Sequence, residues 1–252
     1  MTDSNLRARS TSEIVDAAFA LYRQNLLQYV MVTAVAYAPV LVMSLLSTNA
    51  LEPQSASDLY ALLPVYTVSF VTMALITGVV ARMGSDVYMG QEPDVARTLR
   101  DVAPRVPAII VASLLNGVLI VLGLILLIVP AVYAYTRNFA VAPVVVLEKV
   151  GPFAAFSRSG ALSKGRKWHV FKTLALVLGI YLLLSFGLLL LARMTGSAVI
   201  ALLVSSLYTV VASPVVNLVA MVLYYDCRIR NEGFDLEHMT QALGSRDATP
   251  AY

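Results

Sequence analysis

Charged residues are scarce in this sequence. They make up 13% of the 252 positions, whereas soluble globular domains carry roughly 25%. Hydrophobic residues make up 59%, and the mean hydropathy is +0.77. A water-soluble fold has no core large enough to bury this share of apolar side chains. The composition therefore excludes an ordinary soluble domain and predicts an integral membrane protein.

Cysteine and histidine are also rare. The one cysteine, Cys227, excludes an intramolecular disulfide. The two histidines, His169 and His238, have no second ligand at the spacing of a zinc-binding helix, and no glycine-rich phosphate loop occurs. We therefore expect no cofactor, no metal and no catalytic residue. His169 is interpreted as an anchor at the membrane interface.

The apolar residues are grouped in six blocks, each near the ~20 residues with which a helix crosses a bilayer. The blocks are Leu26–Ser47, Leu59–Ala81, Val106–Val129, Ala131–Leu147, Val170–Ala192 and Ser197–Tyr225. They predict an all-α integral membrane bundle of six transmembrane helices. The fourth block is short and contains Arg137, so a re-entrant or interfacial segment is the alternative there. The tight connection at Pro130 favours a closely joined hairpin.

Basic residues are concentrated in alternate connections. Every Lys and Arg except Arg137 and Arg193 lies before or beside the start of an odd-numbered block, or after the last block. Short cytoplasmic loops retain the excess of Lys and Arg, so both termini are predicted to be cytoplasmic. We expect the membrane domain to cover residues 10–237, between a cytoplasmic tail at 1–9 and a disordered one at 238–252.

Three segments on the basic side have the periodicity of amphipathic helices. They are Ser10–Asn25, Glu92–Val102 and Pro152–Lys164. Ser10 and Glu13 have the spacing of a capping box, Pro93 suits a first helical turn, and Phe153 and Phe156 share one face. We expect these helices to lie in the membrane interface. Each precedes two apolar blocks, which indicates either a threefold repeat (10–90, 91–150 and 151–232) or loops that are independently amphipathic.

Arg137 is the outstanding polar residue within an apolar block. A rise of 1.5 Å per residue from Pro130 places it about 10 Å below the outer end of its helix. There the other predicted spans offer serines and a tyrosine, Ser185, Ser205, Ser206 and Tyr208, but no carboxylate. With Asn116 and Asn217, Arg137 is a candidate site for an anion or a lipid headgroup, since guanidinium groups suit phosphate. The alternative is a structural arginine that reaches the interface or binds helix carbonyls.

A dense polar cluster follows the sixth block. It comprises Tyr224, Tyr225, Asp226, Arg228, Arg230 and Glu232. Asp226 and Arg230 stand four residues apart, as do Arg228 and Glu232, and side chains at this spacing meet on a helix. The tyrosines are expected in the aromatic belt of the interface, and Gly233 suits the end of the helix.

We interpret this cluster as interface anchoring and helix docking. Its acidic side chains are expected to dock onto Lys164, Arg166 or Lys167, which would join the third predicted hairpin to the second. The alternative is a binding site for a lipid headgroup or a partner protein, formed together with these basic residues.

Three stretches resemble signature regions of a bacterial family. They are STSEIVDAAFALYRQN at 10–25, LILLIVPAVYAYTRNFAVAPVVVLEKVGPFAAFSRSGALSKGRKW at 124–168 and LYYDCRIRNEGFDLE at 223–237. The family is the membrane domain attached to some glycerophosphoryl diester phosphodiesterases and also found as stand-alone proteins. The similar positions include Glu148 and Arg158, which we assign to the same anchoring and docking. The resemblance implies a bacterial inner membrane and a link to glycerophospholipid metabolism. The catalytic barrel of two-domain members has no counterpart here, so it implies no phosphodiesterase activity.

The expected function is therefore non-catalytic: a lipid-interacting or scaffold component of the membrane. Its expected partners are membrane lipids, anionic phospholipids among them, and not nucleic acid. The alternative is a transporter of a lipid or small anion with Arg137 in the substrate path, which would require a cavity near that residue. A membrane-embedded enzyme would require Asp226, His169 and Glu148 to lie close together.

Overall fold

The computed structural model describes residues 7–47, 60 and 62–233. In these ranges every regular element is a helix. The helices are α1 (Thr11–Gln24), α2 (Leu26–Leu46), α4 (Leu63–Tyr88), α5 (Val95–Val102), η3 (Ala103–Arg105), α6 (Val106–Leu126), α7 (Ile128–Arg137), α8 (Val141–Leu147), α9 (Pro152–Leu162), α10 (Lys167–Arg193) and α11 (Ala198–Glu232). The predicted disordered tail at 238–252 lies outside the described residues.

Within the described ranges, five helical segments are long and apolar enough to cross a membrane. They are α2, α4, α10, α11 and the continuous segment Val95–Leu126, which joins α5, η3 and α6. Only 11% to 33% of each apolar window is buried inside the protein. The remaining apolar surface needs lipid to cover it, because water would make its exposure costly. The chain is thus an all-helical, multi-pass membrane protein.

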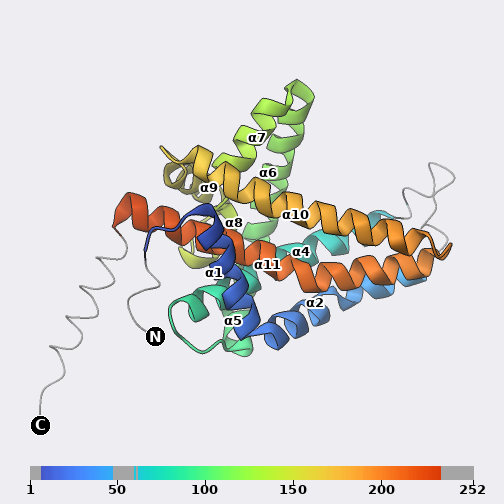
Figure 1. Ribbon diagram of the computed structural model, residues 1–252. Helices are drawn as coiled ribbons and strands as arrows, with labels where there is room; N and C mark the ends of the chain where they lie inside the picture. The colour runs from blue at the N-terminus through green and yellow to red at the C-terminus, as the bar shows by residue number, and fades with distance from the viewer. Residues whose placement is uncertain (1–6, 48–59, 61, 234–252) are drawn as a thin grey trace, which may run out of the picture.

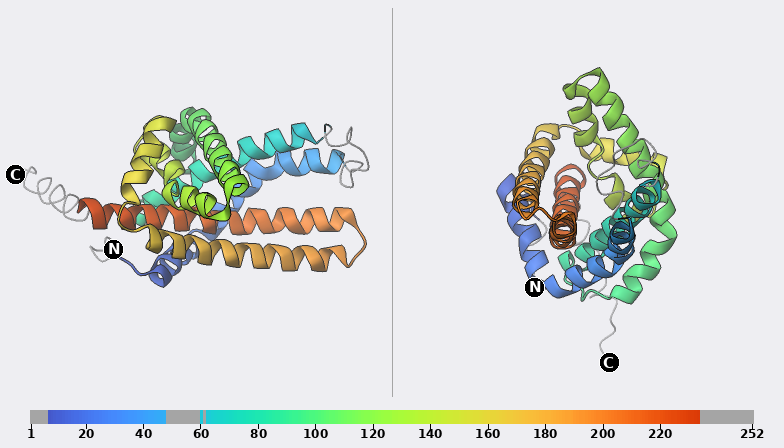
Figure 2. Two further views of the ribbon diagram at one scale, coloured as in Figure 1. Left: turned by 90° about the horizontal axis from the view of Figure 1, so that it is seen from above. Right: turned by 90° about the vertical axis from the view of Figure 1, so that its right-hand side faces the viewer.

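Four long helices form two hairpins that lie side by side (Figures 1 and 2). α2 is paired with α4, and α10 with α11. α11 joins the hairpins because it contacts both α2 and α4. α4 and α11 approach closely at Gly84, where a β-carbon would lie 2.4 Å from a methyl group of Leu218. We call the end at which α2 and α10 begin, and α4 and α11 end, the basic end.

The fourth apolar block is not one helix. α7 has ten residues and α8 has seven, and a turn at residues 138–140 separates them. α6 and α7 form a hairpin that projects away from the other long helices at a steep angle (Figure 1, and the right-hand view of Figure 2). α8 instead turns into the core, where Val144 and Val145 are fully buried. The prediction that Ala131–Leu147 forms a single transmembrane helix is therefore wrong.

The three short helices predicted on the basic side are present. In α1 the capping box forms, with Ser10 and Glu13 bonded reciprocally. α5 begins at Val95 with Asp94 as its N-cap, so Pro93 precedes the helix rather than occupying its first turn. α9 buries Ala155, Ser159 and Leu162, whereas Phe153 is 74% exposed. The two phenylalanines of the predicted apolar face are placed differently, because Phe156 packs against the core whereas Phe153 lies on the surface.

The core lies at the basic end. The second half of α11 is almost entirely buried, from Leu218 to Cys227, and α1, α4, α8 and α9 surround it. The helix ends at Gly233, whose φ of 62° is the left-handed conformation expected of a C-cap glycine. This arrangement places the first part of the polar cluster of α11, from Tyr224 to Asp226, inside a collar of short helices, while Glu232 at the end of the helix is exposed.

Candidate functional site

The α11 charge cluster occupies the last turns of α11 and the helices around it. We define it as Glu148, Arg158, His169, Tyr224, Asp226, Arg228, Arg230 and Glu232. Both ion pairs expected from the spacing along α11 are present. Arg230 Nε lies 2.9 Å from Asp226 Oδ2, and Arg228 Nε lies 3.2 Å from Glu232 Oε2. The cluster has two halves, one around Asp226 and one around Arg158.

Asp226 is the centre of the first half. Its side chain is 1% exposed, so its negative charge needs close partners. Oδ1 accepts a hydrogen bond from the backbone N–H of Arg9 at 2.7 Å, and His169 Nε2 lies 3.1 Å from Oδ2. Arg230, besides pairing with the carboxylate, donates to the carbonyl oxygen of Arg9 at 2.6 Å. Asp226 thus fastens the start of α1 and the start of α10 to α11.

Arg158 is the centre of the second half. Its Nε donates to Glu148 Oε2 at 2.8 Å, and its terminal nitrogens bind the Glu232 carboxylate, one of them at 2.9 Å. These hydrogen bonds, to Glu232 first and then to Glu148, raise the pKa of Arg158 above its ordinary value. Tyr224 donates to Glu148 Oε1 at 2.9 Å. α8, α9 and α11 are therefore joined through one guanidinium group.

The structure corrects the expected docking partners. Arg166 binds the amide oxygen of Asn231 at 3.2 Å, not a carboxylate, and the acidic side chains of α11 pair with Arg158 and His169 instead. His169 is therefore a partner of Asp226 as well as a residue of the basic end. No local pattern in the sequence indicates the contact between Arg9 and Asp226, since it depends on where α1 packs.

Tyr224 and its neighbour Tyr225 are not in an aromatic belt. Tyr224 is 0% exposed and Tyr225 is 4% exposed. Tyr225 stacks on Tyr88, with ring centroids 5.0 Å apart, and shares a hydrogen bond of 2.7 Å with Ser85. Both rings fill the contact between α11 and its neighbours. The prediction that they face the interface is wrong, because α4 and α8 cover this side of α11.

The cluster contains the groups named for an enzyme, and each of them also has partners on neighbouring helices. Asp226 and His169 are in contact, and Glu148 lies in the neighbouring half. Asp226, however, is held by Arg9, Arg230 and His169, and Glu148 by Arg158 and Tyr224. The adjacent thiol of Cys227 is fully buried. Among the described residues, no group of three or more metal-ligating side chains occurs.

Arg137 ends α7 and rests against α9. A β-carbon at Gly160 would lie 3.1 Å from the Nε of Arg137, so the guanidinium packs on the backbone of α9. Four residues earlier on α7, the hydroxyl of Tyr133 accepts a hydrogen bond from Lys167 Nζ at 2.9 Å, and that ammonium lies 4.2 Å from the ring centroid. In the described part of the chain, neither Arg137 nor Lys167 pairs with a carboxylate. The contacts of Arg137 are thus with α7 and α9, rather than with the predicted serines of α10 and α11.

The two asparagines of the predicted anion site form separate hydrogen bonds. Asn116, in the middle of α6, accepts a hydrogen bond from Asn138 Nδ2 at 3.0 Å. Asn138 is the residue that follows Arg137 in the sequence. Asn217 donates to the carbonyl oxygen of Ser213 in its own helix at 2.9 Å. Asn116 therefore marks the level at which α7 ends, whereas the amide of Asn217 is bonded within α11.

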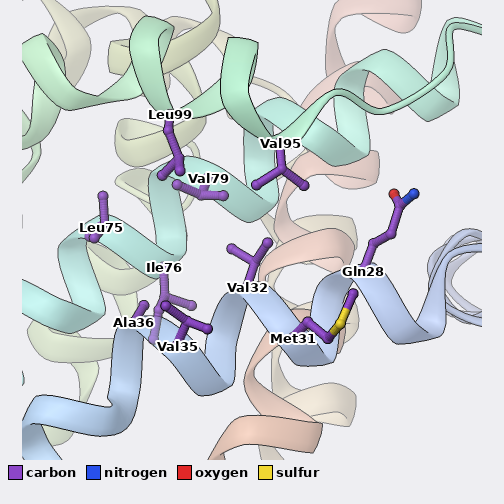
Figure 3. Close-up of a pocket in the computed structure, with 10 residues that line it drawn as sticks. All are labelled: Gln28, Met31, Val32, Val35, Ala36, Leu75, Ile76, Val79, Val95 and Leu99. Atoms are coloured by element: carbon purple, nitrogen blue, oxygen red, sulfur yellow. The ribbon is translucent and has the colours of Figure 1, made fainter.

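Apolar grooves open on the membrane-facing surface. One, of about 310 Å³, lies between α2, α4 and α5. Figure 3 shows its lining side chains, including Val32, Val35, Ile76, Val79, Val95 and Leu99. A second, of about 240 Å³, lies between α1, α10 and α11 and is lined by residues such as Phe19, Ile180, Leu184 and Val211. Grooves with this lining suit hydrocarbon chains.

Comparison of the chain with protein-family models, with curated proteins and with solved structures finds no match. The resemblance to the membrane domain of glycerophosphoryl diester phosphodiesterases therefore stays an expectation from the quoted residues.

Proposed function

We propose that this chain is a non-catalytic, lipid-interacting protein of a bacterial cytoplasmic membrane, with both termini in the cytoplasm. It holds the headgroup of an anionic phospholipid between Arg137 and Lys167. One observation carries the proposal: two cations flank Tyr133 without a carboxylate partner in the described ranges. They stand at the edge of a hairpin that has no charged residue from Val106 to Thr136.

The chemistry of the three side chains suits a phosphate. The guanidinium of Arg137 offers a planar pair of donors, and Lys167 adds a mobile point charge. Tyr133, which is half-exposed, holds the ammonium near the guanidinium. Acyl chains of the bound lipid would then lie along the apolar surface of α6 and α7. The pair of cations is thus complementary to a headgroup rather than to a soluble partner.

The α11 charge cluster has a scaffold role in this proposal. Its carboxylates are each neutralised by residues of neighbouring helices, so the cluster holds α1, α8, α9 and α10 around α11. The rigid collar then keeps α7 and α10 at the spacing that the headgroup requires. A link to glycerophospholipid metabolism rests on the family resemblance alone.

The alternative is a transporter with Arg137 in the substrate path. It requires an open polar cavity at Arg137, Asn116 and Asn217 that is reached from alternate sides. Both apolar grooves are lined by other residues. Asn217 is engaged by its own helix. These observations favour lipid interaction over transport.

Native mass spectrometry of the purified protein tests the proposal. We expect the wild type to retain an anionic phospholipid, and Arg137→Leu to bind it about 10- to 150-fold more weakly, because a charge-assisted hydrogen bond contributes roughly 1.5 to 3 kcal/mol. Arg23→Leu, which removes an exposed arginine of α1 on the same side, is the matched control and should retain the lipid. Equal lipid retention by wild type and Arg137→Leu would overturn the proposal.

The folded state of Arg137→Leu needs its own measurement. Because Arg137 makes no ion pair in the part of the chain that the structure describes, the variant should nearly keep its thermal midpoint. A large fall in the midpoint would instead identify Arg137 as a structural residue.

A further inference from the structure

We propose that the hairpin formed by α6 and α7 does not cross the membrane. It lies within the cytoplasmic leaflet, with the acyl chains of that leaflet as its partner, and the chain crosses the bilayer four times, through α2, α4, α10 and α11. The inference rests on the proposed orientation of the basic end, but it does not require a headgroup to bind at Arg137. Three independent observations support it.

The first observation is the length of the returning limb. α7 has ten residues, and at 1.5 Å per residue it is about 15 Å long, whereas the hydrocarbon core is about 30 Å thick. The two limbs meet tightly at the tip, because a β-carbon at Gly123 would lie 2.6 Å from the backbone nitrogen of Ala131. The bond between Asn116 and Asn138 shows that α7 ends beside the middle of α6. α7 is therefore too short to cross both leaflets.

The second observation is where α7 lies along the other helices. Lys167 is the first residue of α10, at the basic end, and its ammonium is bonded to Tyr133 of α7. Arg137 packs on α9, which belongs to the collar of short helices at the same end. If the hairpin crossed the bilayer alongside α10, Arg137 would lie at the depth of the acyl chains without a partner, which is strongly unfavourable. At the basic end it can reach phosphates and water.

The third observation is the direction of the hairpin relative to α10 and α11. The hairpin is seen along its length when α10 and α11 are seen nearly end-on (right-hand view of Figure 2), so it runs across them rather than beside them. The crossing is close at Gly78 of α4, where a β-carbon would lie 2.7 Å from Val102 and 2.8 Å from Ile109. The missing side chain lets the start of the hairpin pass over α4 at a steep angle.

The surface of the hairpin identifies its partner. Each residue from Ile125 to Val129 at the tip is at least 70% exposed, and no charged residue occurs between Val106 and Thr136. A surface of this size and polarity is strongly unfavourable in water, and hydrocarbon chains can cover it at little cost. The bias of basic residues is the same for four or six crossings, because the tip carries none. The distribution of basic residues therefore does not distinguish four crossings from six, whereas the geometry of the hairpin does.

Single cysteines test the proposal in a Cys227→Ala background. Intact cells are treated with a membrane-impermeant maleimide, with wild type as a check that Cys227 itself is not labelled. Met194→Cys, in the turn after α10, should be labelled from outside, and Lys164→Cys only after permeabilisation. Leu127→Cys, at the tip of the hairpin, should show no labelling from outside. Labelling of Leu127→Cys from outside at a rate near that of Met194→Cys would overturn the proposal.

A hairpin tip buried in the outer leaflet would also escape the maleimide. Nitroxide labels therefore measure how deep the hairpin lies in the bilayer. Spin labels at Leu114, Val121 and Leu127, all more than half exposed, are compared for collisions with oxygen and with a polar nickel complex. A hairpin in one leaflet gives depths that all stay on the cytoplasmic side of the bilayer centre. A crossing hairpin gives depths that pass through the bilayer centre, and this result would refute the inference. Reversed labelling of Met194→Cys and Lys164→Cys would instead refute the proposed orientation.

Discussion

Asp226 shows how a single residue is given a structural role by its neighbours. In the sequence it is one of several charges near the end of an apolar block. In the fold it is 1% exposed and binds groups from α10, from α11 and from the segment before α1. A buried carboxylate with this many partners stabilises the fold chiefly because removing it leaves the partners without a counter-charge.

We therefore predict that Asp226→Asn is strongly destabilising. The loss of charge leaves Arg230 and His169 close together without a buried anion, and breaking such a pair costs about 3 to 5 kcal/mol. Thermal unfolding in detergent measures the effect. Asp16→Asn, an exposed carboxylate on α1, is the control and should be nearly neutral. Equal effects of the two substitutions would exclude an anchoring role for Asp226.

Glu13 gives a prediction about pH. The backbone N–H of Ser10 lowers the pKa of Glu13 most, followed by the hydroxyl of Ser10 and the guanidinium of Arg7, to about 2 from an ordinary value of 4.5. A lowered pKa means that the contribution of Glu13 to stability is complete above pH 4.5 and is lost as the pH falls towards 2. The difference in thermal midpoint between wild type and Glu13→Gln should thus shrink between pH 5 and pH 2. A difference that is constant over this range would contradict the capping box.

At the scale of elements, the hairpin of α6 and α7 depends on a close contact between backbones. Gly123 faces the backbone of Ala131, which cannot move aside as a side chain can. Gly117 lies two turns earlier on α6, and a β-carbon there would have no neighbouring atom within 4 Å. The two glycines therefore have opposite roles in the same helix.

This difference predicts opposite effects of one substitution. Gly123→Ala should lower the thermal midpoint and loosen the hairpin, because α7 must shift away from α6. Gly117→Ala should leave the midpoint unchanged or raise it, since alanine in a helix is favoured over glycine by about 1 kcal/mol. Circular dichroism during heating compares the two variants. A result in which Gly123→Ala is as stable as Gly117→Ala would show that the tip is not tightly packed.

At the scale of the whole molecule, the buried thiol of Cys227 reports global unfolding. It is 0% exposed and lies in the part of α11 that the collar of short helices surrounds. We predict that a maleimide modifies Cys227 in the wild type only when the basic end opens, and that the rate rises steeply near the thermal midpoint. Rapid modification of the native protein in detergent would show that the collar opens locally before the membrane helices separate.

The sequence alone determined the class of protein, most helices and the local contacts. Apolar blocks and helical spacing depend on residues within a few turns of one another, so α1, α2, α10 and α11 lie close to their predicted positions. The pairs of Asp226 with Arg230 and of Arg228 with Glu232 follow from their separation of four residues on a helix. Tyr133 and Arg137 have the same separation of four residues on α7, but no spacing predicts the approach of Lys167 to Tyr133.

Only the tertiary structure decided the direction of the hairpin, the burial of Tyr224 and Tyr225 and the partners of Asp226. Arg158 and Glu232 are 74 residues apart, and Arg9 and Asp226 are 217 apart. No spacing rule predicts such contacts, because they depend on how several helices pack together. The same packing divides the fourth apolar block, since α7 follows the surface of α6 while α8 fills the core beneath α9. A run of apolar residues indicates burial away from water, but lipid and protein interior satisfy it equally.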